Sequence, residues 1–307
     1  MPDWRQVTEE IQSHNINPLD SVRRKYLKIA HEYTGRNVIA YYSAFMQKNS
    51  DVVSIDDNDM NSFMQTIHGL DKSKGLDLIL HTPGRNLASA VSIITYLHSI
   101  FGNNIRVIVP QLAMSAGTMI ALSSKEIIMG KESALGPIDP QFGGVSCSGV
   151  IEEFKRALKE VSENSATFPI WQTIISKYPP VFIGDCEKAI KWASSETQKW
   201  LEKTMFNDIE DSKERSEKAK RVVEELSDHS KTYFHGRQYH SDECKKIGIK
   251  VIDLETLDKR QIKKCKDYQD CVLTVHHAYM QTLATTSAVK IVENHLGNAM
   301  ILSQTSK

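Results

Sequence analysis

The chain of 307 residues contains only five cysteines, and no two of them form a CxxC pair. They are odd in number and widely spaced, at positions 147, 186, 244, 265 and 271. Disulfide frameworks and structural zinc sites both need more closely organised cysteines. The sequence therefore predicts neither, and no other pattern in it predicts a metal ion or an organic cofactor.

Long apolar runs and net charge are also missing. No stretch approaches the roughly 20 apolar residues of a transmembrane helix, and the first residues lack the basic and apolar regions of a signal peptide. Lys plus Arg and Asp plus Glu balance at 38 each, so no overall field indicates nucleic acid or an anionic membrane as a partner. We expect a soluble, cytoplasmic protein that has no transmembrane segment and does not bind nucleic acid.

The first half of the sequence alternates apolar runs with helical patterns. The apolar runs predict strands at 37–42, 76–81, 105–110 and 126–129. The poor alternation of the first run is typical of a strand covered on both faces. Helical patterns lie between them, at 54–68, 87–100 and 117–124. This alternation predicts an α/β fold with a wound parallel sheet.

The second half, beyond Val150, has a different texture. Long, charged, amphipathic helices are predicted at 151–163, 185–206 and 212–227, followed by a short helix capped by Gly248 and a further strand. The tail from Val272 fits either a terminal hairpin or an intersubunit arm. We expect three parts: a helical segment 1–36, an α/β domain 37–255, and a helical C-terminal extension 256–307 that serves as an oligomer arm or partner contact.

Ser115 begins a Ser-Ala-Gly-Thr run that lies between a predicted strand and a short helix. Small neighbours let the backbone turn tightly there, and the helix dipole favours a developing anion. A serine in this place serves either as a nucleophile or as an N-cap. The Pro83-Gly84 turn at the end of the preceding strand and the loop at 136–139 favour the nucleophile.

These motifs together resemble the Clp protease/crotonase superfamily: a strand ending in His-Thr-Pro-Gly (81–84), then Met-Ser-Ala-Gly-Thr (114–118), then Leu-Gly-Pro-Ile-Asp-Pro-Gln (135–141). Within it the chain is most similar to the serine dehydrogenase proteinase family, relatives of signal peptide peptidase A, over about residues 37–251. The resemblance implies a Clp/crotonase-like wound β-sheet with flanking helices, a protein or peptide substrate, and assembly into a homo-oligomer. The charged helices after Asp185 are the candidate interfaces. No lysine lies in a recognisable pyridoxal-phosphate setting, so serine dehydration is not predicted.

The resemblance also assigns the residues that would stabilise the oxyanion. Ser115 is the nucleophile, and backbone N–H groups of Ala116 and of Gly84 or Arg85 form the oxyanion hole. Arg85 departs from the family pattern, because relatives usually have a second glycine there. A non-glycine residue resists positive φ, and the Arg85 side chain could either fill the cleft or hold a substrate carboxylate.

The catalytic base is sought among the lysines. Clp-type enzymes use a histidine, but the stretch 135–141 contains none, whereas peptidase A relatives use a lysine on a later helix. Lys155 lies on the first helix beyond the loop, at the edge of an apolar face that includes Phe154 and Leu158. Partial burial there would lower the pKa of its amine and complete a Ser-Lys dyad. The alternatives are Lys125, Lys131 and Lys159.

Other polar residues are given structural roles or none. His81 is expected to hydrogen-bond neighbouring backbone at its strand end, and Asp139 to fix its loop. Histidines 235, 240, 276 and 277 lack metal-like companions and are assigned nothing. Two rival functions stay open: a non-catalytic binding or scaffold module whose cleft Arg85 blocks, and a crotonase-like acyl-thioester enzyme, which would need a basic pocket that the sequence does not show.

Overall fold

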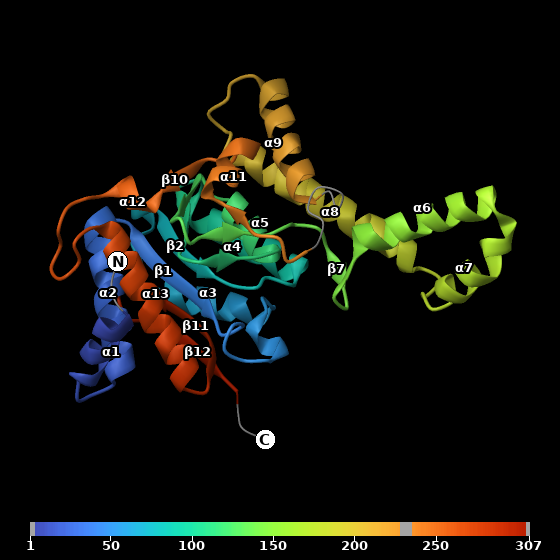
Figure 1. Ribbon diagram of the computed structural model, residues 1–307. Coiled ribbons are helices and arrows are strands. Elements are labelled where there is room, and N and C mark those ends of the chain that lie inside the picture. The colour runs from blue at the N-terminus through green and yellow to red at the C-terminus, as the bar shows by residue number, and fades with distance from the viewer. Residues whose placement is uncertain (1–3, 228–234, 305–307) are drawn as a thin grey trace.

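The computed structural model describes residues 4–227 and 235–304. At its centre lies a sheet with the strand order β10-β5-β3-β2-β1-β11-β12 (Figure 1). The first five of these strands are parallel, β11 is antiparallel to β1, and β12 is antiparallel to β11. The strands are β1 Asn37–Ser43, β2 Leu76–His81, β3 Ile105–Val109, β5 Glu126–Met129, β10 Val251–Asp253, β11 Ala288–Asn294 and β12 Ala299–Ser303.

The predicted apolar strands form the middle of this sheet, and β1 and β2 are buried along their whole length. Successive side chains of a strand point to opposite faces. Accordingly, Ile39 and Tyr41 join one apolar core, whereas Val38, Ala40 and Tyr42 join another on the opposite face. The prediction of an α/β fold with a mostly parallel sheet covered on both faces is confirmed.

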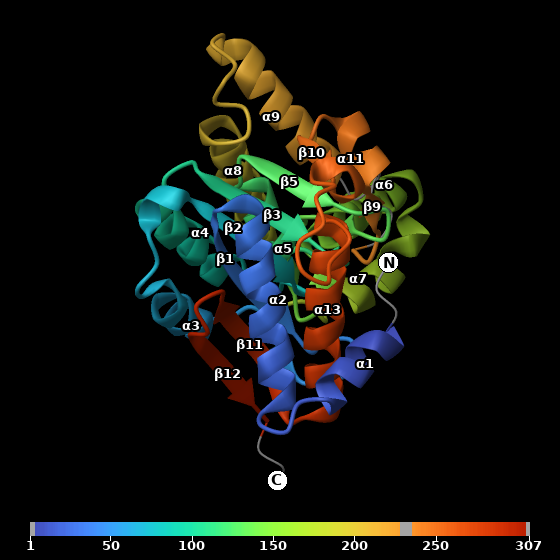
Figure 2. The same cartoon turned by 90° about the vertical axis from the view of Figure 1, so that its left-hand side faces the viewer.

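Helices form a layer on each face of the sheet. One layer contains α3 (Asn58–Ile67), α4 (Leu87–Phe101) and α5 (Ala116–Leu122), whose apolar residues share the core of Ile39. The other contains α2 (Pro18–Thr34) and α13 (Tyr268–Thr285), with α1 (Trp4–Gln12) beside them (Figure 2). Short helices α11 (Ser241–Ile247) and α12 (Leu254–Leu257) flank β10.

The segments expected to lie outside the α/β domain contribute to its core instead. Helix α2 from segment 1–36 packs against α13 from segment 256–307, and β11 adds to the edge of β1. Of the two forms left open for the tail, the structure has the hairpin, formed by β11 and β12. The sequence could not show this because the partner of β1 follows it by more than 240 residues. Contact of this segment with a partner stays a prediction.

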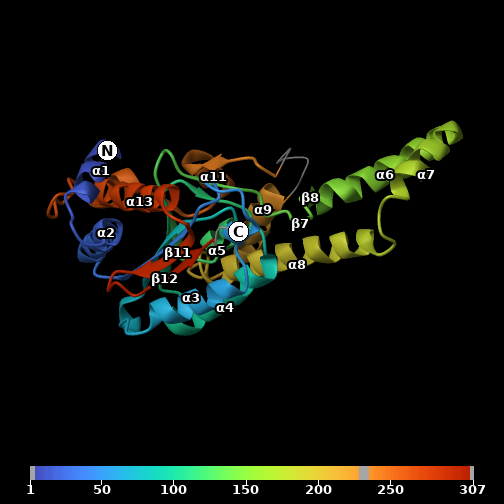
Figure 3. The same ribbon diagram turned by 90° about the horizontal axis from the view of Figure 1, so that it is seen from below.

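A helical arm projects from the sheet. Helix α6 (Cys147–Glu163) and the outer part of α8 (Phe182–Lys203) run side by side, with α7 (Phe168–Ile175) at their tip (Figures 1 and 3). A hairpin of β7 (Gln141–Phe142) and β8 (Val145–Ser146) leads into the arm, and α8 returns from it to the sheet. Helix α9 (Ser212–Ser227) then packs against the inner end of α8 and joins the same core. No helix in the described part of the chain is long and apolar enough to cross a membrane. All five cysteines are buried and unpaired.

Candidate active site

Ser115 lies at the turn between the two-residue strand β4 (Leu112–Ala113) and helix α5. Its backbone has φ 52° and ψ −119°, a conformation that costs a non-glycine residue on the order of 1–3 kcal/mol. Its hydroxyl makes no capping hydrogen bond to the helix. The N-cap role therefore does not explain this serine, and a strained strand-to-helix turn is the setting in which hydrolases present a nucleophilic serine.

The turn at Gly84 packs closely against the turn at Ser115. A Cβ built on Gly84 would lie 2.3 Å from the Met114 carbonyl oxygen and 2.6 Å from the Ala116 nitrogen, so only glycine permits this approach. Arg85 follows with φ 100°, the conformation that a glycine would adopt easily. Its side chain is paired with Asp51 at the cleft wall. Arg85 therefore adopts, at a cost in backbone strain, the conformation that a second glycine would adopt at this position.

The two turns present free backbone donors. The Gly84 carbonyl accepts a 2.8 Å hydrogen bond from the Ile55 N–H, and in a trans peptide the following Arg85 N–H points the opposite way. The Gly84 N–H is occupied by the Thr82 hydroxyl at 3.2 Å. Among the described residues, neither the Arg85 N–H nor the Ala116 N–H has a hydrogen-bond acceptor. Of the two donors left open by the sequence, the geometry favours Arg85 over Gly84.

A cleft of about 600 Å³ opens at Ser115. Its walls come from the start of α4, from α5, from the loop before β7 and from the inner part of α8. Most lining side chains are apolar, and the charged ones are Asp51, Asp56 and Arg85. The residues are Asp51, Asp56, Arg85, Asn86, Leu87, Ala88, Ser115, Ala116, Met119, Ile138, Pro140, Gln141, Phe142, Ala189, Trp192 and Ala193.

The structure does not bring the predicted lysine to this cleft. Lys155 is exposed on α6, the helix that runs away from the sheet (Figure 3). Phe154, on its apolar face, packs against Tyr178 within the arm, and Leu158 is 75% exposed. The expectation of a partly buried amine beside Ser115 assumed that this face would lie on the sheet.

The alternative lysines also lie elsewhere. Lys159 is exposed further along the same helix, and Lys131 lines a separate pocket with His240 and Asp253. Lys125 is exposed at the amino end of β5, the edge of the sheet opposite the Ser115 turn. No lysine of the described chain lines the Ser115 cleft.

Two groups that the sequence did not reveal lie near the cleft. His235 Nδ1 lies 2.7 Å from a carboxylate oxygen of Asp139, which is 1% exposed. Lys290, fully buried on β11, contacts the Ser54 carbonyl at 3.0 Å and Asp59 at 2.8 Å. Both pairings join segments far apart in the chain, so no local spacing could have shown them. Asp139 also accepts a hydrogen bond from Ser146, which agrees with its expected role in fixing the loop.

His81 lies in an aromatic cluster, where its ring packs against Phe45 and His276. Burial lowers the pKa of His81 to about 3, and the backbone at Leu112 opposes this fall. The interaction with Leu112 agrees with the backbone contact expected at this strand end. A neutral, enclosed imidazole has a structural role.

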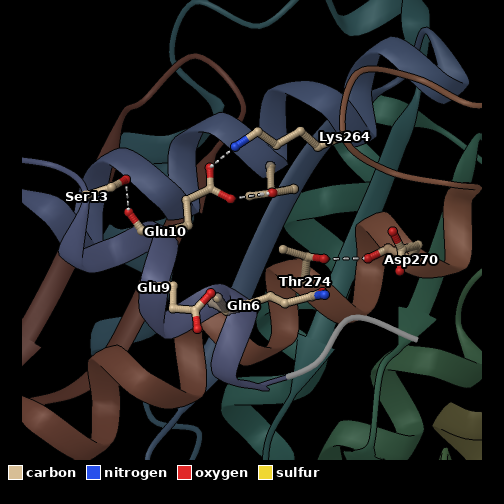
Figure 4. Close-up of a pocket in the computed structure, with 9 residues that line it drawn as sticks. Gln6, Glu9, Glu10, Ser13, Lys264, Asp270 and Thr274 are labelled. Atoms are coloured by element: carbon tan, nitrogen blue, oxygen red, sulfur yellow. Dashed lines mark hydrogen bonds and ion pairs between the residues drawn. The ribbon is translucent and has the colours of Figure 1, made fainter.

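A further pocket of about 530 Å³ lies between α1, α2 and α13 (Figure 4). Its Glu10 carboxylate accepts a 2.7 Å hydrogen bond from Tyr26 and lies 4.0 Å from the Lys264 amine. These contacts tie the helices together on the face of the sheet away from α5. No group of three or more His, Cys, Asp or Glu residues in the described ranges is arranged to hold a metal ion.

Comparison with known proteins agrees with these motifs. Residues 50–292 match the family of ClpP-like SDH-type serine proteinases. Two uncharacterized proteins of Methanocaldococcus jannaschii are similar: MJ1495 is 29% identical over 65% of this chain and 59% of its own length, and MJ0137 is 38% identical over 33% of this chain and 34% of its own. The chain thus matches less than two thirds of either relative. Since the family match spans most of the chain, from the segment before β2 to β11, the chain belongs to the ClpP-like serine dehydrogenase-type proteinase family.

Proposed function

We propose that this chain is a peptidase that hydrolyses peptide bonds with Ser115 as the nucleophile. One observation carries the proposal: the strained, uncapped Ser115 lies directly beside two free backbone N–H groups, those of Arg85 and Ala116. Free donors next to a nucleophile stabilise the oxyanion of acyl transfer, and removal of one such donor typically costs about 10²–10³-fold in rate. Membership of a serine proteinase family supports the same assignment.

The cleft supports a peptide as substrate. A carbonyl oxygen placed between the Arg85 and Ala116 N–H groups would put its carbon in front of the Ser115 hydroxyl. The apolar walls offer room for side chains, with Met119, Phe142 and Trp192 as the largest lining groups. An acyl-thioester carrying a phosphorylated nucleotide would face Asp51 and Asp56 and would find only one basic side chain among the described lining residues. These charges favour peptide hydrolysis over the thioester alternative.

In the Ser-Lys form of this proposal, Lys155 accepts the Ser115 proton. Because Lys155 is exposed on the projecting arm, this form needs the amine to reach a Ser115 cleft by movement of the arm or from a second copy of the chain. A homo-oligomer built through the arm would satisfy that requirement. We also propose that the protein is a homo-oligomer and that it is located in the cytoplasm.

A fluorophosphonate probe tests the nucleophile. We expect stoichiometric labelling, and peptide mapping should place the adduct on Ser115. Ser115→Ala should remove both labelling and peptide hydrolysis. Labelling of that variant at the wild-type rate would overturn the assignment, and a wild-type chain that resists the probe and all peptides would favour the scaffold alternative.

A further inference from the structure

The two edges of the central sheet differ in length and charge. One edge is β10, which is three residues long, contains Asp253 and is flanked by α11 and α12. The other is β12, which is five residues long and contains neither a charged residue nor a proline (Figure 2). Natural sheets protect their edge strands from other chains by short length, charge, proline or covering elements. By these criteria β10 is protected, whereas β12 is open to pairing.

Three residues of β12 direct their backbone groups away from β11. In an antiparallel pair, alternate residues direct both N–H and C=O toward the partner strand. The Asn298 carbonyl accepts a 2.9 Å hydrogen bond from β11, and the Gln304 N–H donates one of 2.9 Å to the carbonyl just before β11. The register shift in this pair places its extra residue in β11, so the alternation along β12 is unbroken. The groups that face outward are therefore those of Ala299, Ile301 and Ser303, and the described chain offers these N–H groups no acceptor.

The surface around β12 carries no charge. No Asp, Glu, Lys or Arg occurs in residues 294–306, and burial lowers the pKa of His295 to about 4, so its ring is neutral at pH 7. Helix α3 packs on β11 and β12, and its one charged residue, Asp59, is buried. Two apolar side chains of the hairpin are exposed instead, Leu296 at 58% and Ile301 at 40%. Exposed apolar groups without charges are the composition found at the core of protein interfaces.

We propose that β12 pairs with β12 of a second copy of this chain, in antiparallel orientation, so that one sheet runs through both protomers. The free backbone groups of a strand edge are matched by those of another strand. Two identical strands in antiparallel orientation are related by a two-fold axis, which is the commonest symmetry of homodimers. With the axis at Ile301, this residue lies opposite its own copy, and Ala299 lies opposite Ser303. The outward groups of these three residues then form about six hydrogen bonds between the protomers.

The register with the axis at Ile301 is the one that uses every outward group. An axis at Met300 would pair only Ala299 with Ile301, which gives about four hydrogen bonds and leaves Ser303 without a partner. The Ile301 axis also places two exposed apolar side chains beside each other and removes them from water. Like charges directly opposite each other destabilise a strand pair, and β12 brings none together.

This interface is separate from the candidate active site and from the arm. The arm projects away from β12 (Figures 1 and 3), so an assembly through the arm and one through β12 do not compete for the same surface. The β12 interface does not rest on the chemistry of Ser115. Its failure and the failure of the proposed function are therefore distinguishable.

Sedimentation velocity of the full chain over a concentration series tests the interface. Ile301→Pro removes the outward N–H and leaves the hydrogen bonds to β11 in place, because an edge strand tolerates proline where the N–H faces solvent. Ile301→Lys instead puts two like charges opposite each other at the axis. The matched control is Leu296→Lys, which adds the same charge to the exposed turn of the same hairpin, outside the proposed pairing. Circular dichroism checks that each variant folds.

We expect a wild-type dimer, or a larger assembly if the arm adds a second interface. Ile301→Pro and Ile301→Lys should each raise the dissociation constant by about 10²-fold or more, which halves the size of the particle. Leu296→Lys should keep the dissociation constant within about threefold.

A cysteine cross-link tests the register. In a hydrogen-bonded antiparallel pair the two Cα atoms lie about 5.5 Å apart, within the range of a disulfide. Ile301→Cys, treated with oxidised glutathione, should therefore form a disulfide-linked dimer, whereas Leu296→Cys should stay unlinked. All five native cysteines are buried, so they provide a low background.

Three results would overturn the proposal. One is a wild-type chain that is monomeric at every concentration. Another is an assembly whose size is the same in both Ile301 variants as in the wild type, and the third is cross-linking of Leu296→Cys as fast as that of Ile301→Cys. Fluorophosphonate labelling of Ser115 in the same samples reports on the proposed function separately, and it should persist in the Ile301 variants.

Discussion

The Ile55 N–H donates a 2.8 Å hydrogen bond to the Gly84 carbonyl oxygen. This bond orients the peptide group whose other end is the free Arg85 N–H. The loop that carries Ile55 is itself held by Lys290, which contacts the Ser54 carbonyl and the carboxylates of Asp56 and Asp59. A buried ammonium on β11 therefore supports the proposed oxyanion donor from behind.

Replacement of Lys290 tests this support. Burial raises the pKa of Asp59, and Lys290 opposes that rise. Because the folded-state pKa lies above the unfolded one, the ionised carboxylate disfavours folding above about pH 4, and protonation removes this penalty as the pH falls. Lys290→Met should thus lower the free energy of unfolding by about 3–5 kcal/mol at pH 7 and by clearly less at pH 4.5.

Urea unfolding at the two pH values measures this difference. The matched control is the double variant Lys290→Met/Asp59→Asn, which removes the uncompensated charge and should recover much of the loss at pH 7. An equal loss at both pH values would contradict the charge argument and leave a packing defect as the cause.

The Ser115 backbone predicts opposite effects on activity and stability. Glycine adopts positive φ without strain, so Ser115→Gly should raise the free energy of unfolding by about 1 kcal/mol while abolishing hydrolysis. Ser115→Ala should be equally inactive without the gain in stability. Thermal unfolding of the two variants measures the contrast, and identical midpoints would argue against strain at this residue.

Gly84 is the position where the two turns touch. Gly84→Ala would place a methyl group 2.3 Å from the Met114 carbonyl oxygen, so we expect a loss of about 3 kcal/mol or more in unfolding free energy, with loss of probe labelling. Gly69 has a similar φ, 83° against 81°, with nothing within 4 Å of its Cβ position. Gly69→Ala therefore measures the backbone term alone, and a loss as large as that of Gly84→Ala would show that close approach of the turns is unimportant.

Arg85 offers a prediction about specificity. Its N–H is retained in any substitution except proline, whereas its guanidinium is the only basic group among the described lining residues of the cleft. Arg85→Gly should leave kcat/KM on a small neutral ester within about twofold and raise KM severalfold for peptides with a carboxylate near the cleaved bond. Asp51→Asn, which releases the guanidinium, should lower that KM. Steady-state kinetics on the neutral ester and on the acidic peptides measures these changes. Unchanged kcat/KM and KM in both variants would show that the Arg85–Asp51 ion pair has no part in substrate binding.

The sheet, and the turns at Gly84 and Ser115 of the candidate site, could be predicted from the sequence for a physical reason. Apolar runs such as 76–81 report directly that a strand is buried on both faces, and parallel strands bring the turns after them to one edge, so Gly84 and Ser115 had to meet. The local sequence does not determine the orientation of α6, because its apolar face can pack within the arm as well as it could pack on the sheet. The position of Lys155 depends on that orientation. His235 and Asp139 meet through a strand pairing between segments about a hundred residues apart, which no single motif encodes.

The place of β11 in the sheet has a consequence for synthesis of the protein. During translation β1 emerges early, but the strand that covers its outer edge follows only with residues 288–294. Until then β1 exposes a row of unpaired backbone groups, the kind of edge that pairs with other chains. Such distant contacts also slow folding, because a long loop must close before they form. A nascent or prematurely ended chain that lacks β11 should therefore depend on chaperones, while the finished chain covers this edge of β1 itself.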